Sequence, residues 1–347
     1  MSALFLCGFL FATPRLAAQS AGESGESDEN KAEVKPPLTP SPESPDKAER
    51  TPLKVTTKDV RHDTPGLAIK PGKVLHTDVD VALVNVTVTD PYNRLVTGLE
   101  PDNFRVFEDN AEQEVVSFSS EDVPISIGVI FDLSGSMSNK ISKAREAAIQ
   151  FFKTANPADE FFMVSFNERA ELTSAFTNNV EDLQSRMLAT SPKGRTALLD
   201  AIHLSVNHVK KGKNPRRALV VLSDGGDNNS RFNQHEVREL LRESDVSLYA
   251  IGILGRMVTA GAMKLLSNMA EETGGRLFQV HNVNQLPEAI AKLSAALRDQ
   301  YMLAYYPTNA NRDGKYRRVQ VRVVPPPNSP SMHASWRVGY YAPSPPY

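Results

Sequence analysis

The stretch around residues 125–138 joins an apolar run to a row of oxygen-bearing side chains. The apolar run predicts a buried strand that ends at Phe131. Asp132, Ser134 and Ser136 follow on alternate positions, and apolar residues then recur at helical spacing through residues 141–155. An acid and two hydroxyls therefore lie at a strand-to-helix turn. In an open α/β sheet this carboxyl edge of the strands is where ligands bind.

Taken alone, these serines could simply cap a helix, because hydroxyls accept hydrogen bonds from the free amides of a first turn. Two further stretches favour a binding site instead. Thr196 stands at the start of another helical pattern. Asp224 follows a second apolar run, residues 219–222, which predicts a second buried strand.

Together these residues resemble the von Willebrand factor type A family, over residues 124–299. The metal-ion-dependent adhesion site of that family uses Asp-x-Ser-x-Ser, then a distant Thr, then a distant Asp. The matching residues occur here in the same order: Asp132, Ser134, Ser136, Thr196 and Asp224. The resemblance implies that these residues bind a divalent cation. It also implies that the two acids act largely through water, which leaves a coordination place for a carboxylate from a partner.

The chemistry of the side chains agrees with this interpretation. Hydroxyl and carboxylate oxygens are hard ligands, which suit Mg²⁺, or Mn²⁺ or Ca²⁺, better than Zn²⁺. Asp132 and Asp224 would repel each other without a cation between them. We therefore expect Mg²⁺ (or Mn²⁺/Ca²⁺) as the cofactor.

Strand and helix patterns alternate through residues 123–300, which predicts an α/β fold with a doubly wound, mostly parallel open sheet. Residues 161–166 and 171–176 are expected to form a strand pair. The resemblance makes the strands that end at Phe131 and Ser223 neighbours. It also implies that the final helix, residues 284–297, can shift when the site takes up a carboxylate.

The flanking residues 76–122 and 301–342 have β character, and each flank is too small to cover its own apolar face. We predict that they form one small all-β, sandwich-like module into which the type A domain is inserted. The flanks resemble those of a secreted family of related proteins best known from Acidobacteria, which shows glycine where this chain has Asn93 and Asn110. One strand is expected through the alternating Trp336, Val338 and Tyr340.

The N-terminal residues predict export. Residues 1–18 are typical of a signal peptide with an apolar core too short to span a bilayer, and 19–75 of a disordered linker rich in Pro, Glu and Ser. Secretion or a periplasmic location follows, with no transmembrane segment in the mature chain. Cys7 is the only cysteine, so no disulfide is expected. The net charge of −2 does not favour nucleic-acid binding.

These observations favour a cation-dependent binding or adhesion module, whose partner is a protein or extracellular-matrix ligand that presents an acidic residue. An architectural factor in the assembly of an envelope complex is the alternative. A metal-dependent hydrolase is a minor one, because none of the seven histidines lies in the three stretches of the site, and no His-Glu-x-x-His occurs. We therefore expect no enzymatic activity.

Overall fold

The computed structural model describes residues 81–254 and 260–345. The predicted signal peptide (1–18) and linker (19–75) lie outside the described residues. Within the two described ranges, no helix is both long enough and apolar enough to cross a membrane.

A six-stranded sheet forms the centre of the α/β domain, and it confirms the predicted fold class. Its strands, in spatial order, are β10 (Leu277–Val280), β9 (Ser247–Ile253), β8 (Arg216–Ser223), β5 (Ile125–Asp132), β6 (Glu160–Phe166) and β7 (Ala170–Thr177). Neighbours pair in parallel except β6 and β7, which form the expected antiparallel pair. The chain runs outward from β5 in one direction and then from β8 in the other. The switch point of the sheet therefore lies between β5 and β8, as expected.

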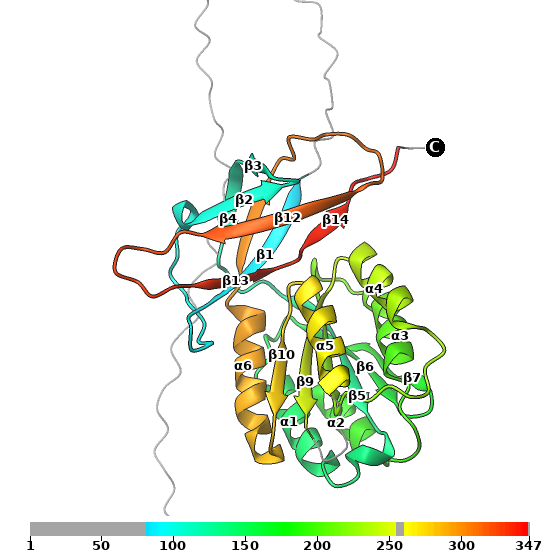
Figure 1. Cartoon of the computed structure of the whole chain (residues 1–347). Coiled ribbons are helices and arrows are strands. Elements are labelled where there is room, and N and C mark those ends of the chain that lie inside the picture. Colours follow the sequence, from blue (N-terminus) through cyan, green and yellow to red (C-terminus); the bar gives the residue numbers. More distant parts are fainter. Residues whose placement is uncertain (1–80, 255–259, 346–347) are drawn as a thin grey trace, which may run out of the picture. The chain divides into compact units, whose positions relative to one another are not determined.

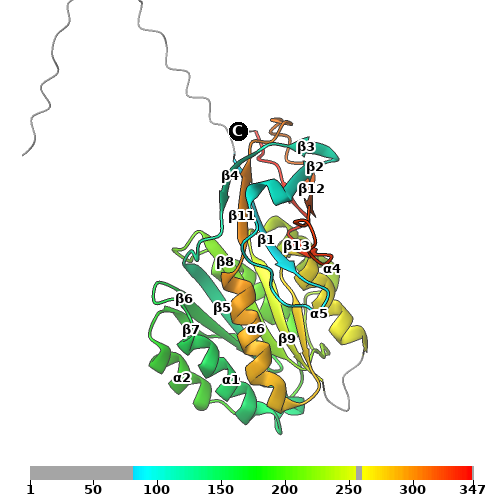
Figure 2. The same ribbon diagram turned by 90° about the vertical axis from the view of Figure 1, so that its left-hand side faces the viewer.

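Helices cover both faces of this sheet (Figure 2). One apolar core packs under α1 (Ile141–Lys153), α2 (Val180–Leu188) and α6 (Leu286–Arg298). The other packs under α3 (Leu198–Val209), α4 (Gln234–Glu243) and α5 (Ala260–Glu272). Short 3₁₀ turns occur at η1 (Pro101–Asn103), η2 (Gly135–Met137) and η3 (Val283–Gln285).

The central strand β5 is buried along its whole length, which explains why its sequence is a continuous apolar run. Close packing makes Gly128 necessary. A Cβ atom at this position would lie 2.2 Å from Cζ of Phe162 and 2.7 Å from Cδ2 of Leu219. The glycine thus leaves room for side chains from the two neighbouring strands, Phe162 of β6 and Leu219 of β8.

The β flanks form two antiparallel four-stranded sheets that share one apolar core (Figure 1). The first sheet has the order β13 (His333–Trp336), β1 (Ala82–Thr89), β11 (Tyr301–Tyr305) and β4 (Val115–Ser119). The second has the order β14 (Gly339–Tyr341), β12 (Tyr316–Val323), β2 (Phe104–Glu108) and β3 (Ala111–Gln113). Each sheet takes two strands from each flank, so the α/β domain is inserted into this β module.

The expected single strand through Trp336, Val338 and Tyr340 is wrong. Trp336 ends β13 in one sheet, and Tyr340 lies in β14 of the other. Between them the chain turns toward the end of α5, where Arg337 forms an isolated antiparallel β-bridge with Thr273. The turns at Asn93 and Asn110 do form, with φ of 61° and 71°, in the left-handed region that asparagine tolerates.

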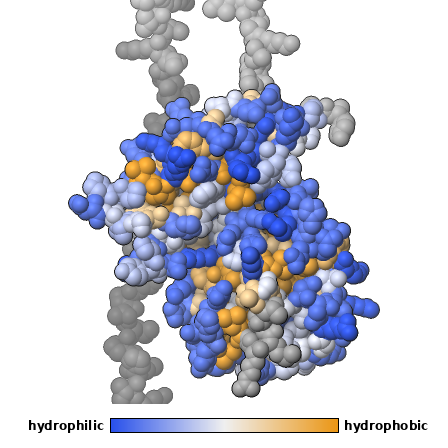
Figure 3. All heavy atoms as spheres, in the orientation of Figure 1, coloured by the Kyte–Doolittle hydropathy of each residue, from blue (hydrophilic) through white to orange (hydrophobic). Residues whose placement is uncertain are grey.

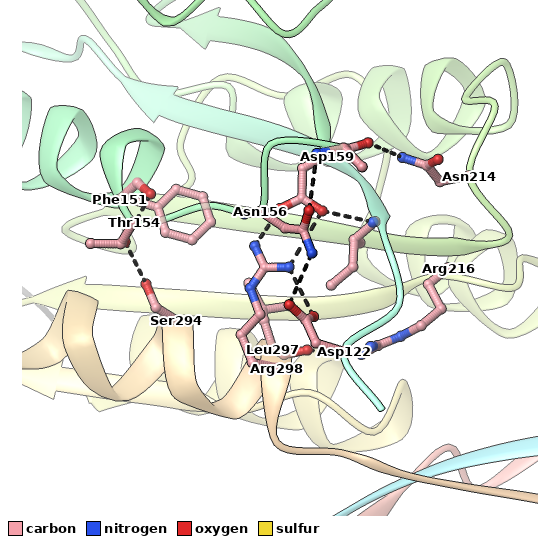
Figure 4. A network of polar contacts seen from close by, with 12 residues as sticks. Asp122, Phe151, Thr154, Asn156, Asp159, Asn214, Arg216, Ser294, Leu297 and Arg298 are labelled. Atoms are coloured by element: carbon pink, nitrogen blue, oxygen red, sulfur yellow. Dashed lines mark hydrogen bonds and ion pairs between the residues drawn. The ribbon is translucent and has the colours of Figure 1, made fainter. Parts of the chain in front are cut away.

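The end of α6 is held by a buried ion-pair network (Figure 4). Arg298 pairs with Asp159, whose side chain is completely buried, and with Asp122. Asp159 also accepts hydrogen bonds from the backbone amides of Ile125, at 2.8 Å, and Asn156, at 3.0 Å. One carboxylate therefore joins the start of β5, the loop before β6 and the last turn of α6.

The short link between α6 and β11 is held by a second set of polar contacts. Arg216 donates to the carbonyl of Leu297 at 2.9 Å and to the side chain of Gln300. The amide nitrogen of Gln300 donates to the hydroxyls of Tyr249, at 2.7 Å, and Thr87, at 3.2 Å. The end of the helix is thus bonded to the α/β sheet and to strand β1.

Apolar residues are mostly enclosed in the three cores. On the face in Figure 3 the surface is largely hydrophilic, with apolar residues gathered in two places, one on the β module and one on the α/β domain. Exposed apolar residues in such numbers are ordinary for a folded chain.

Candidate metal site

Asp132 lies at the carboxyl end of β5 and is fully buried. Both of its carboxylate oxygens accept hydrogen bonds. Oδ1 accepts from the backbone amide of Ser134 at 2.8 Å, and Oδ2 accepts from Oγ of Ser223 at 2.5 Å. Since Ser223 ends the neighbouring strand β8, the carboxylate is held across the switch point of the sheet.

The two hydroxyls of the turn lie together. The Oγ atoms of Ser134 and Ser136 are 3.0 Å apart, and Ser134 is buried whereas Ser136 is exposed. The hydroxyl pair therefore extends from the buried end of β5 to the protein surface.

Thr196 belongs to a loop that is bonded to this turn through the backbone. The amide of Gly135 donates to the carbonyl of Gly194 at 3.1 Å. The amide of Thr196 donates to Oδ1 of Asn228 at 2.9 Å, and its carbonyl accepts from the amides of Asn228 and Asn229. Thr196, which is itself buried, thus lies between the turn after β5 and the loop after β8.

Asp224 follows β8 directly and is also buried. Its Oδ2 atom accepts a hydrogen bond from Nζ of Lys140 at 2.9 Å. The exposed fractions of the two side chains are only 11% for Lys140 and 6% for Asp224. The structure therefore places an ammonium group next to one of the predicted ligands.

Sequence reasoning missed Lys140, although a signal was present. Lys140 is the residue that precedes α1. A cation at the N-terminal end of a helix opposes the helix dipole, so it needs an acidic partner or open solvent to be tolerated. The two buried-strand patterns, which are followed by Asp132 and by Asp224, offered such a partner.

The electrostatics of the site favour the uptake of positive charge. Burial raises the pKa of Asp132 to about 6, and the negative charge of Asp224 acts in the same direction. The hydrogen bonds from Ser134 and Ser223 oppose this rise. A cation between the carboxylates would offset both the cost of burying a charged carboxylate and the repulsion between Asp132 and Asp224.

The donor set fits a hard divalent cation. Within the described part of the chain, no cluster of three or more His, Cys, Asp or Glu side chains could hold a metal ion. Hydroxyl oxygens would therefore have to complete the coordination, as Ser134, Ser136 and Thr196 could. Oxygen donors of this kind suit Mg²⁺. Metal binding by these residues stays a prediction.

The fold and the three joined loops define a doubly wound α/β domain with polar groups at its switch point. Residues 127–226 match the family model of the von Willebrand factor type A domain. The chain therefore contains a von Willebrand factor type A domain. The resemblance of the β flanks to a secreted bacterial family stays a prediction.

Curated relatives match the same part of the chain. Inter-alpha-trypsin inhibitor heavy chain H4 of Bos taurus is 26% identical over 166 residues, which is 44% of this chain and 18% of the relative. The protein of the same name from Sus scrofa is 29% identical over 168 residues, with the same coverage of 44% and 18%. The chain thus spans less than a fifth of the length of these relatives.

Solved structures with a similar fold include bacterial proteins. The conserved hypothetical protein BatB from Bacteroides thetaiotaomicron has 17% identity and a TM-score of 0.42, covering 50% of this chain and 98% of its own. The PilB minor pilin from Streptococcus sanguinis has 14% identity and a TM-score of 0.44, covering 52% and 63%. At this level of identity the similarity concerns the fold alone.

Proposed function

We propose that the type A domain is a divalent-cation-dependent module that binds a protein or matrix partner through an acidic residue of that partner. The observation that carries this proposal is the joining of three separate loops, which bear Asp132, Thr196 and Asp224, at the switch point. When bound, Mg²⁺ would supply an electrophilic centre for the partner's carboxylate. We further propose that the protein acts outside the cytoplasm, as the sequence of residues 1–18 predicts.

The chain's own residues would divide the work. The hydroxyls of Ser134, Ser136 and Thr196 would hold the ion, while Asp132 and Asp224 supply negative charge beside it. The hydrogen bonds that Asp132 accepts from Ser134 and Ser223 fix the orientation of its carboxylate. Such pre-set orientation is typical of groups that support a metal from the second coordination shell.

A binding role is favoured over hydrolysis by the surroundings of the hydroxyls. The Ser134 hydroxyl lies 3.0 Å from that of Ser136, and within the described part of the chain neither hydroxyl has a hydrogen bond to a histidine or lysine side chain. A serine nucleophile needs a neighbouring base to become reactive. We therefore propose a non-enzymatic module.

The proposal is tested with Asp132→Asn, measured by isothermal calorimetry of Mg²⁺ binding to metal-stripped protein. We expect the wild-type chain to bind Mg²⁺ and the variant to bind it roughly 10–100-fold more weakly. Since the folded-state pKa of Asp132 is raised to about 6 from an ordinary 3.8, its ionised form opposes folding at higher pH. The substitution is therefore expected to leave the fold stable without metal.

Asp227→Asn is the matched control for this experiment. Asp227 lies in the same loop as Asp224, but its Oδ1 atom accepts from Oγ of Ser230 at 2.6 Å and from the amide of Leu199. Asparagine can accept the same bonds, so the affinity for Mg²⁺ should change little. A wild-type chain that binds neither Mg²⁺ nor Mn²⁺ would overturn the proposal. If Mg²⁺ does bind, capture of a partner from envelope extract in Mg²⁺ but not in EDTA would extend the proposal to the partner.

A further inference from the structure

The buried ion pair between Lys140 and Asp224 brings a positive charge, the ammonium group of Lys140, next to the five-residue metal site. Lys140 lies four residues after Ser136, and its Nζ atom reaches across to Asp224, which directly follows the neighbouring strand β8. Both side chains are almost inaccessible to solvent. A buried charge is retained only when a partner compensates it, because desolvation is expensive.

With Asp132 and Asp224 counted as carboxylates and Lys140 as an ammonium group, the site without metal has one net negative charge. A divalent cation would turn this into one net positive charge. A single carboxylate from outside would then bring the site to neutrality. With an uncharged residue in place of Lys140, the metal alone would already neutralise the two acids.

We propose that Lys140 couples the two ligands of this site, so that the cation binds weakly by itself and a carboxylate strengthens its binding. The proposal rests on the proposed function and adds a residue that sets its ligand requirement. Lys140 repels the incoming ion and, once the ion is bound, attracts the incoming carboxylate. Both effects are strong because the charges are close together and shielded from water.

The neighbouring Lys143 provides a contrast within the same helix. Its Nζ atom pairs with Glu146 at 2.6 Å, and the exposed fractions of these side chains are 50% and 58%. Solvent screens such a pair, which therefore contributes little to stability or to distant binding. Removing the charge of Lys143 alters the same helix without altering the site.

The test uses the full chain with Lys140→Met, which keeps the length of the side chain and removes its charge. Mg²⁺ binding is measured by calorimetry with and without acetate, the carboxylate probe. We expect acetate to strengthen Mg²⁺ binding severalfold in the wild type. In Lys140→Met we expect Mg²⁺ alone to bind about 10-fold more tightly and acetate to have little effect, within the usual range of coupling between sites.

Thermal unfolding gives a second measurement. Without Lys140, the buried Asp224 has no cationic partner in EDTA among the described residues, so Lys140→Met should lower Tm in EDTA and recover it in Mg²⁺. Lys140→Arg, which keeps the charge, and Lys143→Met should both behave as the wild type does. If Lys140→Met does not fold, Lys140→Gln removes the charge and keeps a hydrogen-bond donor to Asp224.

The outcomes separate the possible roles of Lys140. Tighter binding of Mg²⁺ alone together with loss of the acetate effect supports the coupling. An unchanged Mg²⁺ affinity, or an equal loss of Tm in EDTA and in Mg²⁺, would reduce Lys140 to a structural ion pair and overturn it. If the wild type itself binds no Mg²⁺, the proposed function fails, and this inference fails with it.

Discussion

A chain that ends at Asp299 is expected to lose the ordered β module and to aggregate. Strand β1 would lose both of its neighbours, β11 and β13, and β2 would lose β12. The apolar side chains that these strands bury, such as Val86 and Phe104, would face water. A pair of strands alone is at best marginally stable, so the remaining β2 and β3 cannot compensate.

Amide hydrogen exchange and size-exclusion chromatography check this expectation. Residues 82–119 should exchange as an unfolded segment does in the shortened chain, whereas in the full chain they should be protected. A chain of residues 124–299 serves as the control and should stay soluble, since the two cores on the sheet lie within it. Protected amides in 82–119 of the shortened chain would contradict the shared core.

The second large effect is expected from Arg298→Met, at about 3–5 kcal/mol of lost stability, the range for breaking a buried ion pair on one side. Asp159 would keep its bonds from Ile125 and Asn156, but its buried charge would have no cationic side chain in contact among residues 81–254 and 260–345. Arg298 itself is largely buried, so solvent would screen the remaining charge poorly. Urea unfolding followed by circular dichroism measures the loss.

Two further variants make this measurement specific. Lys292→Met removes an exposed ion pair with Glu288 from the same helix and should cost less than about 0.5 kcal/mol. Asp159→Asn added to Arg298→Met removes the uncompensated charge and should restore much of the stability. A loss below about 1 kcal/mol in Arg298→Met would mean that the network contributes no more than a surface pair does.

The network also bears on the shift of the final helix that the family resemblance implies. In this structure the last turn of α6 is bonded through Arg298, and the carbonyl of Leu297 accepts from Arg216. A shift of α6 along the sheet would have to break these buried contacts. We therefore expect α6 to stay in place when a ligand binds, unless the gain at the metal site exceeds this cost.

Much of the α/β domain could be predicted from sequence because its signals are local. The apolar run before Asp132, the helical spacing of residues 141–155 and the final helix expected at residues 284–297 correspond to β5, α1 and α6. The order of the candidate ligands along the chain also predicted that they lie at the same edge of the sheet. These features depend on neighbouring residues and on general rules for parallel sheets.

The parts that could not be predicted depend on contacts between distant residues. The position of Lys140 before a helix indicates that it needs an acidic partner, but the sequence does not indicate that this partner is Asp224, which is 84 residues away. The break between β13 and β14 arises because Val338 donates its amide to the carbonyl of Glu272 on α5. Apolar alternation continues across that break, so a pattern of period two cannot detect it.

The insertion of one domain into another has a consequence for how the chain is made. Leu99 contacts the hydroxyl of Tyr301 across a separation of 202 residues. At about 5–20 residues per second, a ribosome needs roughly 10–40 s to synthesise the residues between them. The C-terminal strands of the β module therefore follow the first, N-terminal set of strands after that delay. Proteolysis of nascent chains stalled before and after residue 345 would show when the first set becomes protected. Before the C-terminal strands are made, β1 and β2 have their apolar faces exposed to water. We therefore expect the α/β domain to fold first and to bring the two halves of the β module together.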